Sequence, residues 1–123
     1  MQNRPRIAVV DDDQSVREAL ENLISSVGYE VDLFESAKGF LDSAEINNTA
    51  CLVLDLRMPE MSGLELQQTL RDDGRNIPII IVTAHGEDTA RTEALAAGAV
   101  AFLNKPFQEE VLLGAINSAI GKN

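Results

Sequence analysis

A small set of polar residues stands at or just beyond the ends of short apolar runs in this sequence: Asp11, Asp12, Asp55, Thr83 and Lys105. If the fold brought the three carboxylates together, they would repel one another unless a cation neutralised them. An all-oxygen set of this kind suits Mg²⁺ or Mn²⁺. A lysine and a hydroxyl nearby would stabilise a phosphoryl group during transfer. Because a carboxylate oxygen can also act as the nucleophile, the pattern predicts phosphoryl transfer through an acyl phosphate.

Each of these residues also has an ordinary structural explanation when taken alone. An aspartate at a strand end is more often a turn former than a nucleophile, and Asp13 is expected to be the N-cap of a helix. Thr83 could simply open a loop, and Lys105 could be a solvated surface lysine. Their coincidence at successive strand ends favours a shared site. Asp55 is the preferred nucleophile because it stands alone after the middle run, facing the pair after the first.

The elements that would position these residues alternate along the chain. Short apolar runs rich in β-branched residues predict strands, at residues 7–10, 31–34, 51–54, 77–82 and 100–103. The first, third and fourth runs are nearly continuous, as in strands covered on both faces. The second alternates around Asp32, which predicts an edge strand. Cys51 lies in the third run and is expected to be a core residue, not a nucleophile.

Apolar residues with helical spacing lie between and after these runs. The stripes span residues 16–27, 37–44, 66–70, 90–97 and 111–120, and Val27, Leu95 and Val111 are among their members. Gly28, Gly98 and Gly121 are expected to end three of the helices. Five strand–helix repeats predict one domain over residues 1–123, a doubly wound α/β sandwich with a five-stranded parallel sheet and helices on both faces. Ligands bind beyond the carboxyl ends of such strands.

The composition argues against a nucleic-acid-binding protein and against a membrane-spanning one. A net charge of −10 and a pI near 4.4 disfavour direct binding to nucleic-acid phosphates. No apolar run approaches the roughly 20 residues that span a bilayer. The first residues lack the apolar core of a signal peptide. The expected location is therefore the cytoplasm, without a membrane partner.

The sequence resembles the receiver domain of two-component response regulators, within the CheY-like superfamily. The resemblance rests on Val9-Val10-Asp11-Asp12-Asp13, Leu54-Asp55-Leu56-Arg57-Met58-Pro59-Glu60-Met61-Ser62-Gly63, Val82-Thr83-Ala84 and Leu103-Asn104-Lys105-Pro106-Phe107. It covers essentially the whole chain and implies five parallel strands in the order 2-1-3-4-5 with five helices. The Arg57-Met58-Pro59 and Lys105-Pro106-Phe107 segments are closest to FixJ-type receivers, which usually precede a DNA-binding domain.

The resemblance implies a role for each site residue. Asp55 would accept a phosphoryl group from a histidine kinase. Asp12 and Asp55 would bind Mg²⁺ directly, with Asp11 acting mainly through water and the backbone carbonyl of Arg57 as a further ligand. Thr83 and Lys105 would contact the phosphoryl group.

The same resemblance implies a switch. Phe102 falls at the aromatic position whose ring turns inward when Thr83 moves toward the phosphate, and a cis peptide bond between Lys105 and Pro106 would aim the lysine at the site. The surface formed by the fourth helix, fifth strand and fifth helix would then control homodimerisation or an output domain that regulates transcription and lies outside this chain. The domain would assist its own phosphorylation and dephosphorylation, as a signalling module rather than an ordinary enzyme.

Two variable positions and two rival functions remain open. The resemblance implies that Arg57 and His85 border the path of attacking water and alter the lifetime of the acyl phosphate, although an exposed loop histidine is an equally good explanation of His85. A metal-dependent phosphatase or phosphotransferase for small molecules would favour a second acidic residue where Arg57 stands. A flavodoxin-like cofactor binder would need a Ser/Thr/Gly-rich loop where three consecutive aspartates follow the first strand.

Overall fold

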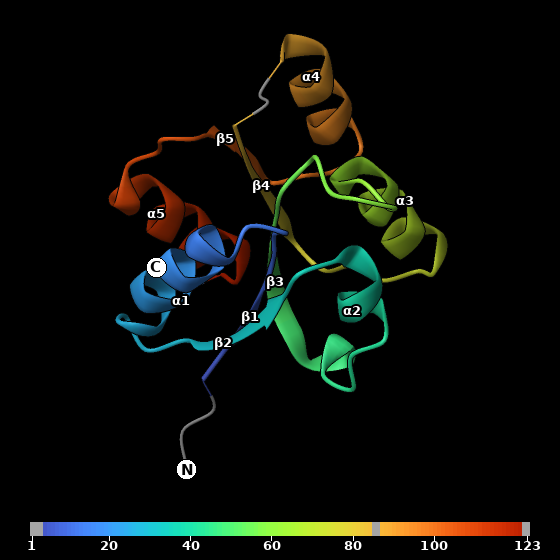
Figure 1. Cartoon of the computed structure of the whole chain (residues 1–123). Coiled ribbons are helices and arrows are strands. Elements are labelled where there is room, and N and C mark those ends of the chain that lie inside the picture. Colours follow the sequence, from blue (N-terminus) through green and yellow to red (C-terminus); the bar gives the residue numbers. More distant parts are fainter. Residues whose placement is uncertain (1–3, 85–86, 122–123) are drawn as a thin grey trace.

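The computed structural model of the protein describes residues 4–84 and 87–121. Five parallel strands form its sheet, in the order β2-β1-β3-β4-β5, which confirms the predicted order (Figure 1). Their bounds are β1 Arg6–Val10, β2 Glu30–Phe34, β3 Thr49–Leu54, β4 Ile79–Thr83 and β5 Ala101–Asn104.

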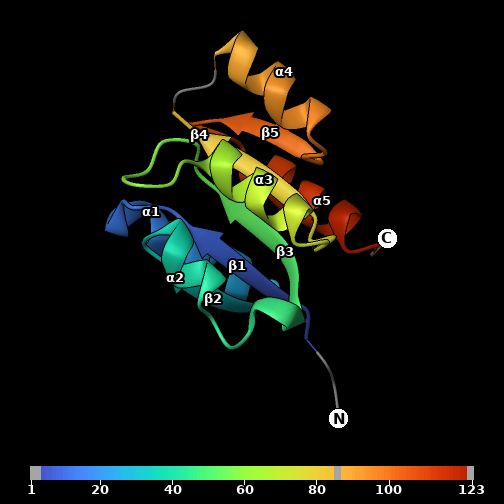
Figure 2. The same ribbon diagram turned by 90° about the vertical axis from the view of Figure 1, so that its right-hand side faces the viewer.

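Helices cover both faces of the sheet, as expected. They are α1 Gln14–Ser25, α2 Ala37–Leu41, α3 Gly63–Asp72, α4 Asp88–Ala96 and α5 Glu109–Ala119, with a short 3₁₀ helix, η1, at Ile46–Asn48. Helices α1 and α5 pack on one face and α2 and α3 on the other, while α4 lies beside the β5 edge (Figures 1 and 2). Each face carries its own apolar cluster, so the sheet separates two cores.

Burial along the strands follows the apolar pattern. Every residue of β4 is buried, as are Ile7–Val10 of β1 and Cys51–Leu54 of β3, because helices cover both faces of these central strands. No residue of β2 is fully buried, which confirms its place at the edge. Cys51 is completely buried, which confirms that it is a core residue, and this burial raises the pKa of its thiol to about 12.

Several predicted ends of elements were wrong. Helix α1 stops at Ser25, which leaves Val27 beyond it and 52% exposed. Leu95 and Val111 lie within α4 and α5 but face solvent, because helical spacing does not determine which side of a wide stripe meets the sheet. Strand β4 begins two residues later than predicted, after Pro78, whose nitrogen cannot donate a ladder hydrogen bond.

Local capping explains where other helices begin and end. The Asp13 side chain accepts hydrogen bonds from the backbone N–H groups of Ser15 and Val16, which confirms it as the N-cap of α1. Gly28 and Gly98 follow α1 and α4 with φ of 101° and 104°, the left-handed conformation that ends helices. No helix in the described part of the chain is long and apolar enough to cross a membrane.

Candidate functional site

Backbone hydrogen bonds extend the strand ladder one residue beyond β1 and β3. They therefore hold the backbone of Asp11 and Asp55 in place. The Asp11 N–H donates to the Phe34 carbonyl at 3.1 Å, and the Asp55 N–H donates to the Val10 carbonyl at 3.1 Å. The Lys105 N–H donates to the Thr83 carbonyl at 2.9 Å and holds the loop after β5 beside the end of β4. The residues predicted from strand ends therefore meet at one edge of the sheet.

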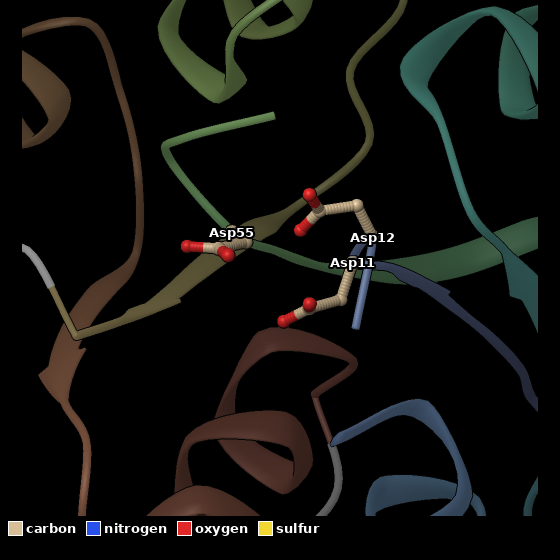
Figure 3. A group of neighbouring side chains, drawn as sticks. All are labelled: Asp11, Asp12 and Asp55. Atoms are coloured by element: carbon tan, nitrogen blue, oxygen red, sulfur yellow. The ribbon is translucent and has the colours of Figure 1, made fainter. Parts of the chain in front are cut away.

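Three carboxylates form the centre of this edge. Carboxylate oxygens of Asp11, Asp12 and Asp55 all lie within 4.8 Å of one another, beyond the carboxyl ends of β1 and β3 (Figure 3). Asp11 and Asp55 are 2% and 8% exposed, whereas Asp12 is exposed to solvent. Burial raises the pKa of Asp11, although the Asp13 N–H and Lys105 both oppose that shift. The cluster thus holds negative charge at a cost in desolvation.

Lys105 provides a cation on the other side of the cluster. Its Nζ donates to Asp11 Oδ2 at 2.9 Å and lies 3.9 Å from Asp55 Oδ2. The peptide bond to Pro106 is cis, as the resemblance implied. Asp55 Oδ1 is buried and has no hydrogen-bond partner among the described residues. A buried, unpaired carboxylate oxygen beside two further carboxylates fits an oxygen-ligated divalent cation.

Thr83 and Phe102 lie on neighbouring strands, β4 and β5, two positions apart in register. Thr83 is the last residue of β4 and is completely buried. Phe102, in β5, pairs in register with Ile81, two residues before Thr83. Its ring is 6% exposed and belongs to the apolar cluster that includes Ala94 of α4. In this structure the aromatic ring is therefore packed inward, beneath α4.

One contact at the mouth of the site was not predicted. Arg57, two residues after Asp55, places its Nη2 3.0 Å from Oε1 of Glu87. Glu87 is the N-cap residue of α4, yet its side chain makes no capping hydrogen bond. The pair joins the loop after β3 to the start of α4. The only sequence signal for this pair was the acidic Glu87 just before the fourth helix. His85, the other residue predicted to border the site, lies outside the described residues.

Two further residues that the sequence reasoning missed support the aspartates. Arg17 of α1 donates from Nη1 to the Asp11 backbone carbonyl at 2.6 Å. Gly63, the first residue of α3, lies so close to the loop that a Cβ there would be 2.3 Å from the Asp55 carbonyl oxygen. Its N–H donates to the Leu56 carbonyl at 2.8 Å. Only glycine fits this contact, and the Ser62-Gly63 pair before a helical stripe was its sequence signal.

Comparison with known proteins gives one consistent result. The model of the response regulator receiver domain matches residues 7–117. Response regulator protein TodT of Pseudomonas putida is 48% identical over 114 residues, which cover 93% of this chain and 50% of that protein. Transcriptional regulatory protein FixJ of Bradyrhizobium diazoefficiens is 40% identical over 120 residues, covering 98% of this chain and 58% of that protein. The chain spans about half the length of these curated relatives.

Solved structures agree with the fold. The response regulator StyR superimposes with a TM-score of 0.89 at 48% identity, covering 97% of this chain and 60% of that one. The structure described as FixJ-N gives a TM-score of 0.85 at 41% identity, with 98% and 96% covered. The similarity therefore extends over the sheet, its helices and the edge that carries the three aspartates.

Proposed function

This chain belongs to the family of response regulator receiver domains of two-component systems, and we propose that it is a phosphorylation-controlled switch in which Asp55 accepts the phosphoryl group. The carrying observation is the position of Asp55: its carboxylate lies beside Asp11, Asp12 and Lys105, with Oδ1 buried and unpaired among the described residues. A sensor histidine kinase is the proposed donor, which implies a cytoplasmic location.

The acidic cluster is the proposed binding site of Mg²⁺, or of Mn²⁺ in its place. Asp12 and Asp55 would hold the ion directly, Asp11 mainly through water, and the backbone carbonyl of Arg57 would add a neutral oxygen. When bound, the cation neutralises the carboxylates and the oxygens of the transferred group. The support is that all three side chains offer oxygens within 4.8 Å of one another.

In the proposed reaction, a carboxylate oxygen of Asp55 attacks phosphorus while the bond to the donor's imidazole nitrogen breaks. The imidazole leaves with the bonding electron pair, and Asp55 becomes an acyl phosphate. Lys105 would turn from Asp11 toward a phosphoryl oxygen, a short movement because its Nζ already lies 3.9 Å from Asp55 Oδ2. Thr83 would donate its hydroxyl hydrogen to another oxygen.

The proposed switch passes through Thr83 and Phe102 to the surface of α4, β5 and α5. Ala94 is the only fully buried residue of α4, so little apolar area holds this helix in one position. Exposed Leu95 and Val111 supply apolar contacts on that surface. We propose that phosphorylation makes it a homodimer contact or couples it to an output domain that regulates transcription, since relatives about twice as long include transcriptional regulators.

The phosphorylation proposal is tested by incubating the purified chain with Mg²⁺ and acetyl phosphate and measuring intact mass. A mass gain of one phosphoryl group is expected, and Asp55→Asn should abolish it while keeping the circular dichroism spectrum. Labelling of the variant to the same extent would contradict the assignment. Sustained turnover of a chromogenic phosphate ester would instead support the alternative function, a phosphatase. Arg57 argues against that function, because a phosphatase of this kind would favour an acidic residue two positions after Asp55.

A further inference from the structure

A second concave site lies at the edge of the sheet opposite the aspartates. It has a volume of about 440 Å³ and is lined by the C-terminal parts of α3 and α4 and by the residues that lead into β4 and β5. Figure 2 shows α3 in front of β4 and α4 above β5, with the two helices running in a similar direction. Because the aspartates follow the carboxyl ends of the strands, this groove is separate from the proposed phosphorylation site.

The lining of the groove has an unusual charge for this protein. The chain has 20 acidic and 10 basic residues, yet among the described residues the groove is lined by Arg71 and Arg75 and by no acidic side chain. Leu70, Ile77 and Val100 supply apolar walls, and Val100 is 52% exposed. A cationic rim around apolar walls is complementary to an anion attached to an apolar group.

Polar groups beneath this groove are incompletely paired. Gln67 is 1% exposed, and its Oε1 has no hydrogen-bond partner among the described residues. The Nε of Arg75 is likewise buried and unpaired there, although its Nη1 contacts Asn47. Unpaired buried groups are costly, so a small shift of Arg75 toward an anion would improve its pairing. The Nε–H of Arg75 could therefore donate a hydrogen bond to a carboxylate after such a shift.

The groove is also connected to α4. Arg71 donates from Nη1 to the Ala97 carbonyl at 3.1 Å, and Gln67 donates from Nε2 to the Ala94 carbonyl at 3.0 Å. These α3 side chains hold the C-terminal end of a helix with only one fully buried residue. A ligand that binds Arg71 would therefore weaken its contact with the Ala97 carbonyl and change how the end of α4 is held.

From this chemistry we propose that the groove is a docking site for an acidic peptide segment of a partner protein. A carboxylate of the segment pairs with Arg71 and Arg75, and a neighbouring apolar side chain packs against Leu70, Ile77 and Val100. A peptide supplies both groups at adjacent positions, which a simple inorganic anion does not. Binding does not require phosphorylation of Asp55.

The test is an NMR titration of the ¹⁵N-labelled chain with an acetylated, amidated peptide of sequence Leu-Glu-Leu-Asp-Glu. Saturable shifts are expected at residues 70–79 and 94–100, and a peptide with lysine at each acidic position should produce none. Acetate at the same concentration should also leave these residues unchanged. Equal shifts with acetate would overturn the peptide assignment, as would binding of the lysine peptide or shifts confined to other residues.

Variants locate the site independently. Arg71→Gln and Arg75→Gln should each weaken the peptide's affinity by about fivefold or more. Arg91→Gln is the matched control, because Arg91 is an exposed arginine of α4 that does not line the groove. An equal loss in the control would overturn the proposal. Matching shifts on simple dilution of the unliganded chain would assign the groove to a second copy and also overturn it.

Discussion

Lys105 donates a hydrogen bond to Asp11 at 2.9 Å, while its distance to Asp55 is 3.9 Å. Its ammonium group thus compensates the carboxylate that is most buried, at 2% exposure, and whose pKa burial raises. Asp55 is left beside the cation without a direct bond to it. This arrangement partly compensates the charge of the acidic site and leaves the buried Oδ1 of Asp55 without a partner among the described residues.

Replacing Lys105 by Met should keep the apolar stem and remove the ammonium group. Asp11 would then be buried without its cationic partner, so the free energy of unfolding at neutral pH should fall by about 1–3 kcal/mol. Urea unfolding followed by circular dichroism measures the change. Lys38→Met is the control, because Lys38 pairs with Asp42 at 2.8 Å but is 79% exposed and should show no measurable loss. Equal losses would contradict the role of Lys105.

The raised pKa of Asp11 predicts how stability depends on pH. Between its ordinary value of 3.8 and its higher value in the folded protein, the folded state binds the proton more tightly than the unfolded state. Stability from this residue is therefore lost as pH rises through that window. Asp11→Asn removes this titrating group and should flatten this part of the curve.

Unfolding curves collected from acid to neutral pH in a metal-free buffer check the Asp11 prediction. Asp42→Asn serves as the control, since Asp42 pairs at the surface with Lys38. A slope that stays unchanged in Asp11→Asn, or that changes equally in the control, would contradict burial as the cause.

Mg²⁺ should stabilise the folded chain through the acidic cluster. For a single site, the gain is about 1.4 kcal/mol at a concentration ten times Kd. Asp12→Asn should abolish most of this gain, because it removes one of the three clustered carboxylates. Asp13→Asn should retain it, since Asp13 caps α1 and asparagine is an equally good N-cap. Thermal unfolding with and without Mg²⁺ distinguishes these neighbouring residues, and an equal loss in both variants would argue against the assignment.

Much of this architecture was predictable because strand burial and ligand position follow general rules. Continuous apolar runs marked β1, β3 and β4, and the carboxyl ends of parallel strands necessarily lie at one edge. Asp11 and Asp55 could therefore be brought together before their distance was known. Spacing did not reveal that Leu95 and Val111 face solvent, because exposure depends on how each helix is rotated against the sheet.

Contacts between loops were beyond prediction for a different reason. Whether Lys105 hydrogen-bonds Asp11 or Asp55 depends on side-chain rotamers at the ends of separate strands. The pairing of Arg57 with Glu87 likewise joins residues 30 positions apart through two loops, and no periodic pattern records it. Gly63 was visible as a turn residue, but its contact with the Asp55 carbonyl required the path of the whole loop.

Gly63 provides a sharp steric prediction. In Gly63→Ala the new Cβ would lie 2.3 Å from the Asp55 carbonyl oxygen, so α3 or the loop must move, at a cost of about 2 kcal/mol or more. Gly114→Ala is the matched control, because a Cβ there meets nothing within 4 Å inside α5. That change should stabilise the protein by about 0.5–1 kcal/mol. Opposite signs in urea unfolding are expected, and destabilisation of similar size in both would contradict the steric account.

The ion pair between Arg57 and Glu87 predicts coupling between Asp55, the proposed phosphoacceptor, and α4. Both side chains are largely exposed, 60% and 71%, so the pair itself contributes at most about 1 kcal/mol to stability. A phosphoryl group on Asp55 adds nearly two negative charges close to Arg57 and should compete with Glu87 for it. Glu87→Gln frees Arg57 in advance and should change the acyl-phosphate lifetime by about two- to fivefold.

A double-mutant cycle separates this coupling from independent effects. Arg57→Gln, Glu87→Gln and the double variant are each labelled with acetyl phosphate, and the decay of the phosphorylated mass is followed. If the two residues act through their ion pair, Glu87→Gln should have little further effect once Arg57 has been replaced. Purely additive effects would mean that each residue acts alone on the site. Glu93→Gln, on an exposed position of α4, should leave the lifetime unchanged and controls for loss of charge from that helix.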